Sequence, residues 1–252
     1  MKSKVVTDIE LRSRWYANRT EKITVPSEAV LTPAAKDFIK ENNIMLAFGD
    51  EFGERGFSKT PFPEENGRPV FIDAATGEKV FEKKENYTHL RGNILVPKTH
   101  PRIALRGKID SLIADVIQIQ IISSNEGDFE LIEDLEELLC FIKMILHAEV
   151  TETPLNSISL LGMNSEELRY KSQNIKEFFG FDHQMPSYKN GAVCASLNKL
   201  RTSVRECELV AVNAFPIEQR IDIVEALNRL SSCIYILYCK KLSNRCDGGI
   251  VK

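Results

Sequence analysis

Three charged residues near the C-terminal end of the chain have a spacing that suits chemistry on an anion. Arg201, Arg205 and Glu208 stand at positions i, i+4 and i+7, so on a helix they share one face. The neighbouring apolar stripe consists of Leu197, Leu200 and Val204, with Cys207 and Ala211 as candidate extensions. Guanidinium groups held beside such a stripe bind carboxylates or phosphates through their paired N–H donors. Two amphipathic helices joined by an Arg–Glu ladder fit the same pattern, and both interpretations stay open at this point.

A second helical pattern follows and carries Asn228 and Arg229 between its apolar positions. Those apolar positions are Ile221, Val224, Leu227, Leu230 and Ile234. The segment 213–216 (NAFP) marks the turn between the two helices, because proline cannot continue a helix interior. Short connections favour antiparallel neighbours, so Asn228 and Arg229 are expected on the helix that faces the first set.

These two segments, LNKLRTSVRECE at 197–208 and EALNRLSSCIYIL at 225–237, resemble a known family. They are similar to the C-terminal helices of the ethanolamine-utilisation ATP:corrinoid (cobalamin) adenosyltransferases and, more distantly, to those of the propanediol-utilisation type. The resemblance continues through 100–110 (HPRIALRGKID) and 179–183 (FGFDH), and it covers roughly residues 1–242. It implies transfer of the 5′-deoxyadenosyl group of ATP to the cobalt of reduced cobalamin, with release of triphosphate. The adenosylcobalamin formed would serve ethanolamine ammonia-lyase.

The resemblance also implies roles for the charged residues. Negative charge builds on the triphosphate as it leaves, and guanidinium groups with a magnesium ion are suited to stabilise it. Arg201, Arg205 and Glu208 are therefore predicted to be catalytic, with Asn228 and Arg229 completing the clamp around ATP. Glu208 would orient an arginine, or contact the ribose or the magnesium ion. The alternative is an Arg–Glu pair that only ties helices together.

A second basic cluster, Arg102, Arg106 and Lys108 with Asp110, opens another helical pattern. A helix N-terminus offers free N–H groups and a favourable dipole to anions, so this cluster is predicted to bind phosphate. A simply solvated face is the alternative. The propanediol type has a T-G-D-x-G phosphate loop that this sequence lacks, and residues 88–98 with the cluster would take its place.

An aromatic, proline-containing stretch precedes the first of the two C-terminal helices. In the similar enzymes, apolar side chains inserted beneath the corrin ring remove its lower axial ligand and so allow reduction to Co(I). Phe178, Phe179 and Met185 are the residues predicted to bind the corrinoid in this way. His183 in the same stretch could ligate cobalt, although a lone histidine in a loop is more often a hydrogen-bonding surface residue.

The sequence departs from the resembling families at two places. Many ethanolamine-type enzymes carry a His and a Cys-Cys-x-x-Cys cluster that binds a divalent metal, and here the cysteine positions hold Ile72, Asp73 and Thr76. Without those ligands no tetrahedral zinc or iron site is predicted there, although one built from distant residues stays open. The propanediol type has an arginine-paired Asp where this chain has Ser232, so that salt bridge is not expected.

Loss of the metal cluster motivates a second hypothesis, a non-catalytic corrinoid-binding or scaffold protein of the ethanolamine-utilisation system. Retention of Arg201, Arg205, Asn228 and Arg229 favours the enzyme, because a carrier has no need of a triphosphate clamp. A plain helical bundle that mediates protein contacts is a third reading. The resemblance implies a homo-oligomer, with ethanolamine ammonia-lyase or its reactivating factor and a flavin reductase as partners.

Composition limits the partners and the cellular compartment that we expect for the protein. A net charge of −3 argues against a nucleic-acid-binding surface, which would carry a concentrated basic excess. No apolar run is long enough to span a bilayer and no signal peptide heads the chain, so no membrane association is expected. The six cysteines lack C-x-x-C spacing and suit a reducing compartment. We expect a cytoplasmic protein, and association with a bacterial microcompartment stays open.

The predicted fold is mainly α, an antiparallel bundle of about five helices over residues 91–252. Residues 1–90 are expected to form a small α/β N-terminal unit and an irregular, hairpin-containing loop region. In that unit, a helix begins at Pro33 after the N-cap Thr32, between strands at 22–25 and 44–48. The prediction also includes a short helix around Trp15 and a hairpin with its turn at 75–78. Further bundle helices are predicted to begin at residue 101 and to span 128–147 and 165–178.

Overall fold

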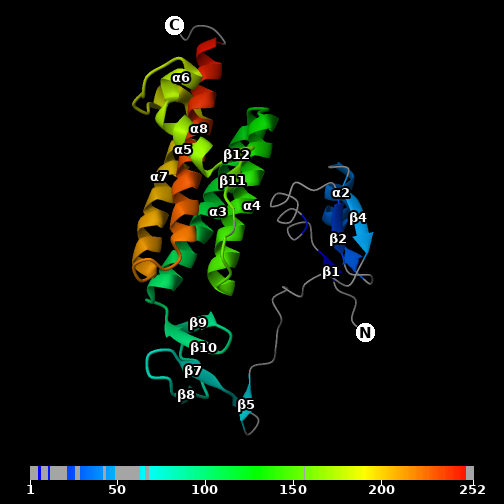
Figure 1. The fold of residues 1–252 in the computed structure, drawn as a ribbon, viewed down its shortest axis with the longest axis vertical. Helices are drawn as coiled ribbons and strands as arrows, with labels where there is room; N and C mark the ends of the chain where they lie inside the picture. Colours follow the sequence, from blue (N-terminus) through cyan, green and yellow to red (C-terminus); the bar gives the residue numbers. More distant parts are fainter. Residues whose placement is uncertain are drawn as a thin grey trace. The chain divides into compact units, whose positions relative to one another are not determined.

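A computed structural model describes residues 5–6, 11, 22–25, 29–41, 44–48, 63–65, 68–155 and 157–247. The chain separates into two compact units, Met1–Pro61 and Phe62–Lys252 (Figure 1). The helix expected around Trp15 lies outside the described residues. The boundary expected at residue 90 falls inside the second unit, because strand β7 (Phe71–Asp73) pairs in parallel with strand β10 (Ile94–Pro97) across it.

The first unit contains a strand–helix–strand motif. Strand β2 (Lys22–Val25) pairs in parallel with β4 (Met45–Phe48), and helix α2 (Pro33–Glu41) makes the crossover that a parallel pair requires. The Thr32 hydroxyl accepts a hydrogen bond from the Ala35 N–H at 3.2 Å, which confirms the predicted N-cap. A second parallel pair joins β1 (Val5–Val6) to β3 (Val30–Leu31). The small core consists of Val6, Leu11, Ile23, Val25, Ala35, Phe38 and Ile44.

A four-stranded sheet opens the second unit, in the order β8-β7-β10-β9. Strand β8 (Lys79–Val80) forms the predicted hairpin with β7, and β9 (Tyr87–Arg91) pairs antiparallel with β10. The Asp73 carboxylate closes the hairpin turn by accepting the Ala75 N–H at 2.8 Å. A separate ribbon joins β5 (Glu64–Glu65) to β6 (Arg68–Pro69). Of the three positions that replace the cysteines, Ile72 and Asp73 lie in strand β7 and Thr76 lies in the turn that follows it. The described residues contain no group of three or more His, Cys, Asp and Glu residues that could hold a metal ion.

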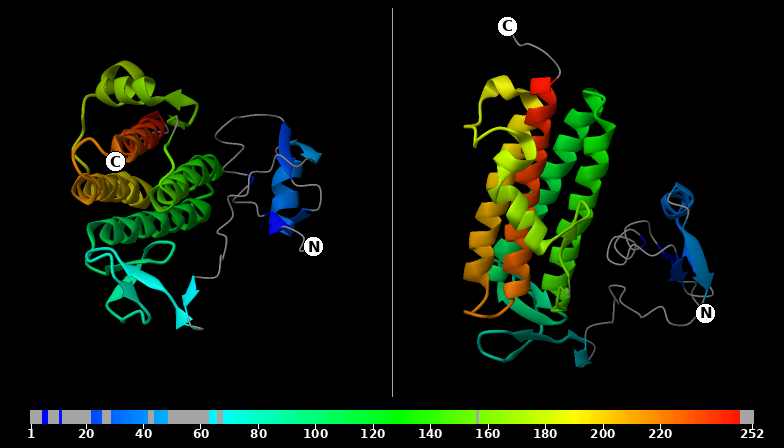
Figure 2. Two further views of the ribbon diagram at one scale, coloured as in Figure 1. Left: turned by 60° about the horizontal axis from the view of Figure 1, so that its bottom comes forward. Right: turned by 45° about the horizontal axis from the view of Figure 1, so that its top comes forward.

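Four long helices form the bundle and lie side by side in both views of Figure 2. They are α3 (Pro101–Asn125), α4 (Phe129–Thr151), α7 (Gly191–Ala214) and α8 (Ile221–Asp247). The sheet lies at the end where α3 begins and α7 turns into α8 (Figure 1). This arrangement confirms the mainly α bundle. Among the described helices, none is long and apolar enough to cross a membrane.

Shorter elements cover α8 between α4 and α7. The ribbon β11 (Ser159–Leu160) and β12 (Met163–Asn164) leads into α5 (Ser165–Gln173) and α6 (Ile175–Phe179), and a 3-10 turn, η1 (Tyr188–Asn190), precedes α7. The single helix expected at 165–178 is thus two helices. Asn174, with ψ of 47°, leaves the helical conformation and hydrogen-bonds the Tyr170 carbonyl through its side chain and its backbone N–H.

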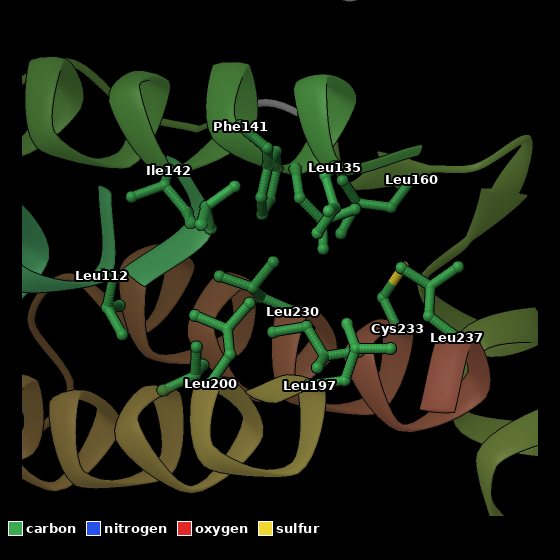
Figure 3. Packing of buried hydrophobic residues seen from close by; sticks show 14 of the residues in the cluster. Leu112, Leu135, Phe141, Ile142, Leu160, Leu197, Leu200, Leu230, Cys233 and Leu237 are labelled. Atoms are coloured by element: carbon green, nitrogen blue, oxygen red, sulfur yellow. The ribbon is translucent and has the colours of Figure 1, made fainter. Parts of the chain in front are cut away.

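The bundle core confirms the predicted stripe of α7. Its members Leu197, Leu200, Val204, Cys207 and Ala211 are all fully buried. Figure 3 shows Leu135, Phe141 and Ile142 of α4 pointing toward Leu197, Leu200 and Leu230 of the two C-terminal helices. On α8 the prediction fails at Ile221, which is 58% exposed because it begins the helix. Ile223 and Ala226 are buried instead.

Candidate functional site

Two of the predicted catalytic residues on α7, Glu208 and Arg201, contact helix α8. The Glu208 carboxylate on α7 accepts a hydrogen bond from Asn228 Nδ2 on α8 at 2.9 Å. About two turns earlier on the same face of α7, the Arg201 guanidinium carbon lies 5.6 Å from the centroid of the Tyr235 ring on α8. The second contact lies seven residues before the first on α7 (Glu208 to Arg201) and seven residues after it on α8 (Asn228 to Tyr235), as expected for antiparallel helices. Arg205 therefore lies between them, and these five residues are called the α7–α8 seam below.

The two seam arginines are open to an incoming anion. Arg205 is exposed, and within the described residues it forms no hydrogen bond or ion pair. Besides its contact with the Tyr235 ring, Arg201 donates only long hydrogen bonds, at 3.2 and 3.4 Å, to Asn198 Oδ1 on its own helix. In the part of the chain that the structure describes, neither guanidinium has a carboxylate partner. Such groups can bind phosphate oxygens without first leaving another partner.

Arg229 is turned away from the seam. It donates to Asn228 Oδ1 at 2.6 Å through Nη1 and to Ser165 Oγ at 2.7 Å through Nε. Its Nη2 lies 3.6 Å from Glu225, and the Ser165 hydroxyl donates to that same carboxylate at 2.7 Å. Successive residues of a helix point about 100° apart, so Asn228 faces α7 while Arg229 faces α5. Arg229 thus holds the Asn228 side chain by a hydrogen bond from the side of α5.

A pocket of about 990 Å³ lies on the α5 side of Arg229. Its lining includes Ser165, Tyr170, Lys171, Phe178, Glu225 and Arg229. The Lys171 ammonium lies 5.4 Å from the Phe178 ring centroid and 5.6 Å from that of Phe179. Phe178 is 43% exposed, whereas Phe179 packs against the core. The pocket therefore unites an aromatic residue predicted to bind corrinoid with an arginine predicted to bind ATP.

The stretch between α6 and α7 is attached to α8 through His183. Its Nδ1 lies 2.5 Å from the Tyr235 hydroxyl, and the two rings stack with centroids 5.6 Å apart. Burial raises the pKa of Tyr235, so the phenol stays protonated at neutral pH. His183 is therefore a hydrogen-bonding residue here. Met185, two positions later, is 88% exposed.

The basic cluster at the start of α3 is largely occupied by carboxylates. Arg102 donates to Glu149 Oε1 at 2.5 Å and to Glu152 Oε1 at 2.8 Å. Arg106 donates through Nε to the other Glu149 oxygen and through Nη2 to the Leu90 carbonyl at 2.8 Å. Glu149 is fully buried on α4. Phosphate could reach these two arginines only by displacing Glu149.

The rest of the α3 N-terminus offers less positive charge than the sequence suggested. His100 caps the helix by accepting the Arg102 N–H at 3.2 Å. Burial, together with the positive charges of Arg102 and Arg106, lowers the pKa of His100, so its ring is neutral and able to accept. Lys108 pairs with exposed Glu206 on α7 at 3.2 Å, and Asp110 is exposed. Because its ion pair with Glu206 is exposed, Lys108 is the residue of the predicted cluster that could most easily exchange a carboxylate for a phosphate. Phosphate binding by Lys108 stays a prediction.

Residues 81–241 match the family model described as Cobalamin adenosyltransferase, which is more than half of the chain. The chain belongs to the cobalamin adenosyltransferase family. It is 30% identical over 248 residues to the corrinoid adenosyltransferase EutT of Salmonella typhimurium, with 92% of this chain and 90% of that relative covered. The EutT protein of Escherichia coli K12 is 29% identical over 253 residues, with the same two coverages.

A solved structure shows the same fold. It is a variant of the PduO-type ATP:corrinoid adenosyltransferase of Lactobacillus reuteri, complexed with cobalamin and ATP. The TM-score is 0.51 at 21% identity, and the match covers 65% of this chain and 91% of that chain. The helical bundle of this family member is therefore the adenosyltransferase bundle.

Several residues of the site were not identified from the sequence. Glu149, Ser165 and Tyr235 each contact a predicted site residue, and each lies on another element than its partner. One signal was present for Glu149, since an isolated carboxylate in an apolar helical segment requires a cationic partner. Its partners could not be identified, because Arg102 and Arg106 lie more than forty positions away.

Removal of the Asn228 amide tests its role in the seam. In Asn228→Ala, Glu208 loses its donor and is free to pair with Arg205 one turn earlier on α7, in competition with ATP. We expect the KM for ATP to rise by about tenfold, the equivalent of one charge-assisted hydrogen bond. Steady-state kinetics against ATP concentration measure this. Ser231→Ala is the matched control, because that hydroxyl bonds only the Asn228 carbonyl of its own helix. An unchanged KM in Asn228→Ala would contradict the role.

Proposed function

We propose that this family member transfers the 5′-deoxyadenosyl group of ATP to the cobalt of reduced cobalamin and releases triphosphate. The observation that carries the proposal is the α7–α8 seam, where Arg201 and Arg205 have no carboxylate partner among the described residues and Glu208 is fixed by Asn228. The names of the relatives and the ligands of the PduO-type structure support the same chemistry.

The reaction needs charge stabilisation at the leaving group. The electron pair of Co(I) forms the bond to C5′ of ATP, the C5′–O bond breaks, and its electrons remain on the triphosphate. Arg201 and Arg205 are proposed to bind triphosphate oxygens, where preorganised donors stabilise the developing charge. Magnesium favours carboxylate and phosphate oxygens, and the Glu208 carboxylate, held at one oxygen by Asn228, fits as its protein ligand.

The corrinoid is proposed to lie against the apolar residues between α5 and α7. Phe178 and Met185 are exposed, as is Tyr188 at 86%, and apolar side chains kept in water at a site are suited to cover an apolar ring system. Phe179 packs on the core behind Phe178 and would hold this surface in place. These residues would occupy the lower face of the ring, where they exclude an axial ligand.

The setting of the reaction is also a proposal. The ethanolamine-utilisation context comes from the name of the relatives, and ethanolamine ammonia-lyase would receive the product. A homo-oligomer, the lyase reactivating factor and a flavin reductase are proposed partners. We place the protein in the cytoplasm, either free or associated with a bacterial microcompartment.

ATP binding separates the enzyme from a non-catalytic corrinoid carrier. Titration calorimetry with Mg-ATP in the presence of cobalamin is expected to show binding by the wild type. In Arg201→Ala/Arg205→Ala the affinity should fall at least about a hundredfold, since each charged contact to phosphate is worth about 1.5–3 kcal/mol. A wild-type protein that binds cobalamin and does not bind ATP would support the carrier and contradict the enzyme.

A further inference from the structure

Tyr235 contacts both halves of the proposed site. The guanidinium of Arg201, which is proposed to bind triphosphate, lies over the Tyr235 ring at 5.6 Å. The His183 ring stacks on it at an interplanar angle of 15° and reaches its hydroxyl through Nδ1. Tyr238, one turn along α8, stacks on it as well, with centroids 6.2 Å apart. One aromatic side chain therefore lies between the arginine proposed for triphosphate and the segment proposed for corrinoid.

The segment 180–187 has few other attachments. Its beginning is held by Phe181, which packs against the core. Its exposed Asp182 pairs with exposed Lys176 at 3.1 Å, a contact of little energetic weight. Beyond its end, Asn190 donates to the Tyr238 hydroxyl at 3.2 Å. The position of the middle of the segment, including exposed Met185, therefore depends on the contact between His183 and Tyr235.

We propose that Tyr235 is a positioning residue that couples anion binding at Arg201 to the placement of segment 180–187, with His183 as the contact of the segment. This inference rests on the proposed function. An anion at Arg201 draws the guanidinium toward itself and takes up part of its charge, so the attraction between Arg201 and the Tyr235 ring changes. The Tyr235 ring and the His183 ring stacked on it then adopt a single orientation together. Coupling between two binding sites is reciprocal, so ATP and corrinoid raise each other's affinity by the same factor.

The test compares the Kd of cob(II)alamin with and without Mg-ATP, a pair that does not react in the absence of a reductant. In the wild type we expect ATP to tighten cob(II)alamin binding by about tenfold. In Tyr235→Leu and in His183→Gln the ratio of the two Kd values is expected to fall below about twofold. Tyr235→Phe keeps the ring and loses the hydroxyl, so its ratio should be intermediate. Circular dichroism confirms that each variant is folded.

Two further comparisons decide the interpretation. Tyr238→Phe removes the neighbouring hydroxyl, which contacts neither Arg201 nor His183, and is expected to keep the wild-type ratio. If it lowers the ratio as much as Tyr235→Phe, general anchoring of the segment replaces the proposed link. If His183→Gln weakens cob(II)alamin binding equally with and without ATP, His183 touches the corrinoid directly and the proposal is overturned. Wild-type ratios in Tyr235→Leu also overturn it.

Failure of this inference can be distinguished from failure of the proposed function. If the wild-type protein forms adenosylcobalamin while ATP leaves its affinity for cob(II)alamin unchanged, the proposed function holds and the proposed coupling is wrong. If the wild-type protein binds no ATP, both proposals are wrong.

Discussion

Replacing Arg205 by alanine is expected to lower kcat/KM for adenosyl transfer by about 10²–10³-fold while the fold stays intact. Arg205 lies in the middle of the α7–α8 seam, is exposed, and has no carboxylate partner among the described residues. Its loss should therefore remove stabilisation of the leaving triphosphate and leave no buried group unsatisfied. Stability should be unchanged for the same reason. Anaerobic assays with cob(I)alamin, together with a thermal melt, measure both quantities.

Two variants control this result. Arg205→Lys keeps the charge and loses the paired N–H donors, so activity should be partly restored. Lys199→Ala removes a cation from another face of α7, where Lys199 pairs with Asp115, and is expected to change kcat/KM by less than about threefold because exposed ion pairs contribute little. Wild-type turnover in Arg205→Ala would show that the triphosphate binds elsewhere.

Replacing Glu149 by alanine is expected to lower the free energy of unfolding by about 3–5 kcal/mol. Glu149 is fully buried and accepts from both Arg102 and Arg106, whose side chains are only 13% and 16% exposed. Without it, Arg106 loses its carboxylate partner and Arg102 keeps only the partly exposed Glu152, at the end of the bundle where the sheet attaches through Arg106 and Leu90. Urea denaturation followed by circular dichroism measures the change.

Matched variants separate the charge from the packing. Glu152→Ala removes a partner of Arg102 that is 34% exposed, and it should cost about 1 kcal/mol or less. The triple variant Arg102→Met/Arg106→Met/Glu149→Leu replaces the whole cluster by apolar side chains and should recover most of the lost stability. Stability of Glu149→Ala within about 1 kcal/mol of the wild type would mean that Arg102 and Arg106 find another anion, and phosphate would become their natural ligand.

Local sequence pattern was enough to predict the long helices and the face of α7. The stripe from Leu197 to Ala211 repeats at helical spacing, and burial of that stripe fixes Arg201, Arg205 and Glu208 on the adjoining face. The strand–helix–strand motif and the hairpin at 75–78 were predicted for a similar reason, because Thr32, Pro33 and Gly77 carry strong local signals.

What could not be predicted depends on contacts between distant segments. Arg229 was expected to complete the clamp around ATP, yet its partner Ser165 lies on α5, and only the packing of α5 against α8 reveals that direction. Arg102 and Arg106 looked free because Glu149 lies on the next helix. Tyr235 lies within an apolar run of α8, and its spacing gives no sign that it faces Arg201 and His183.

The proposed adenosyl transfer is tested most directly by an anaerobic assay of chelator-treated protein with ATP, added magnesium and chemically generated cob(I)alamin. Formation of the cobalt–carbon bond is followed by absorbance, and triphosphate is quantified in the same sample. We expect adenosylcobalamin and triphosphate in equal amounts, although Ile72, Asp73 and Thr76 offer no thiolate to a metal. Absence of product from protein that still binds ATP and cobalamin would contradict the proposed transfer.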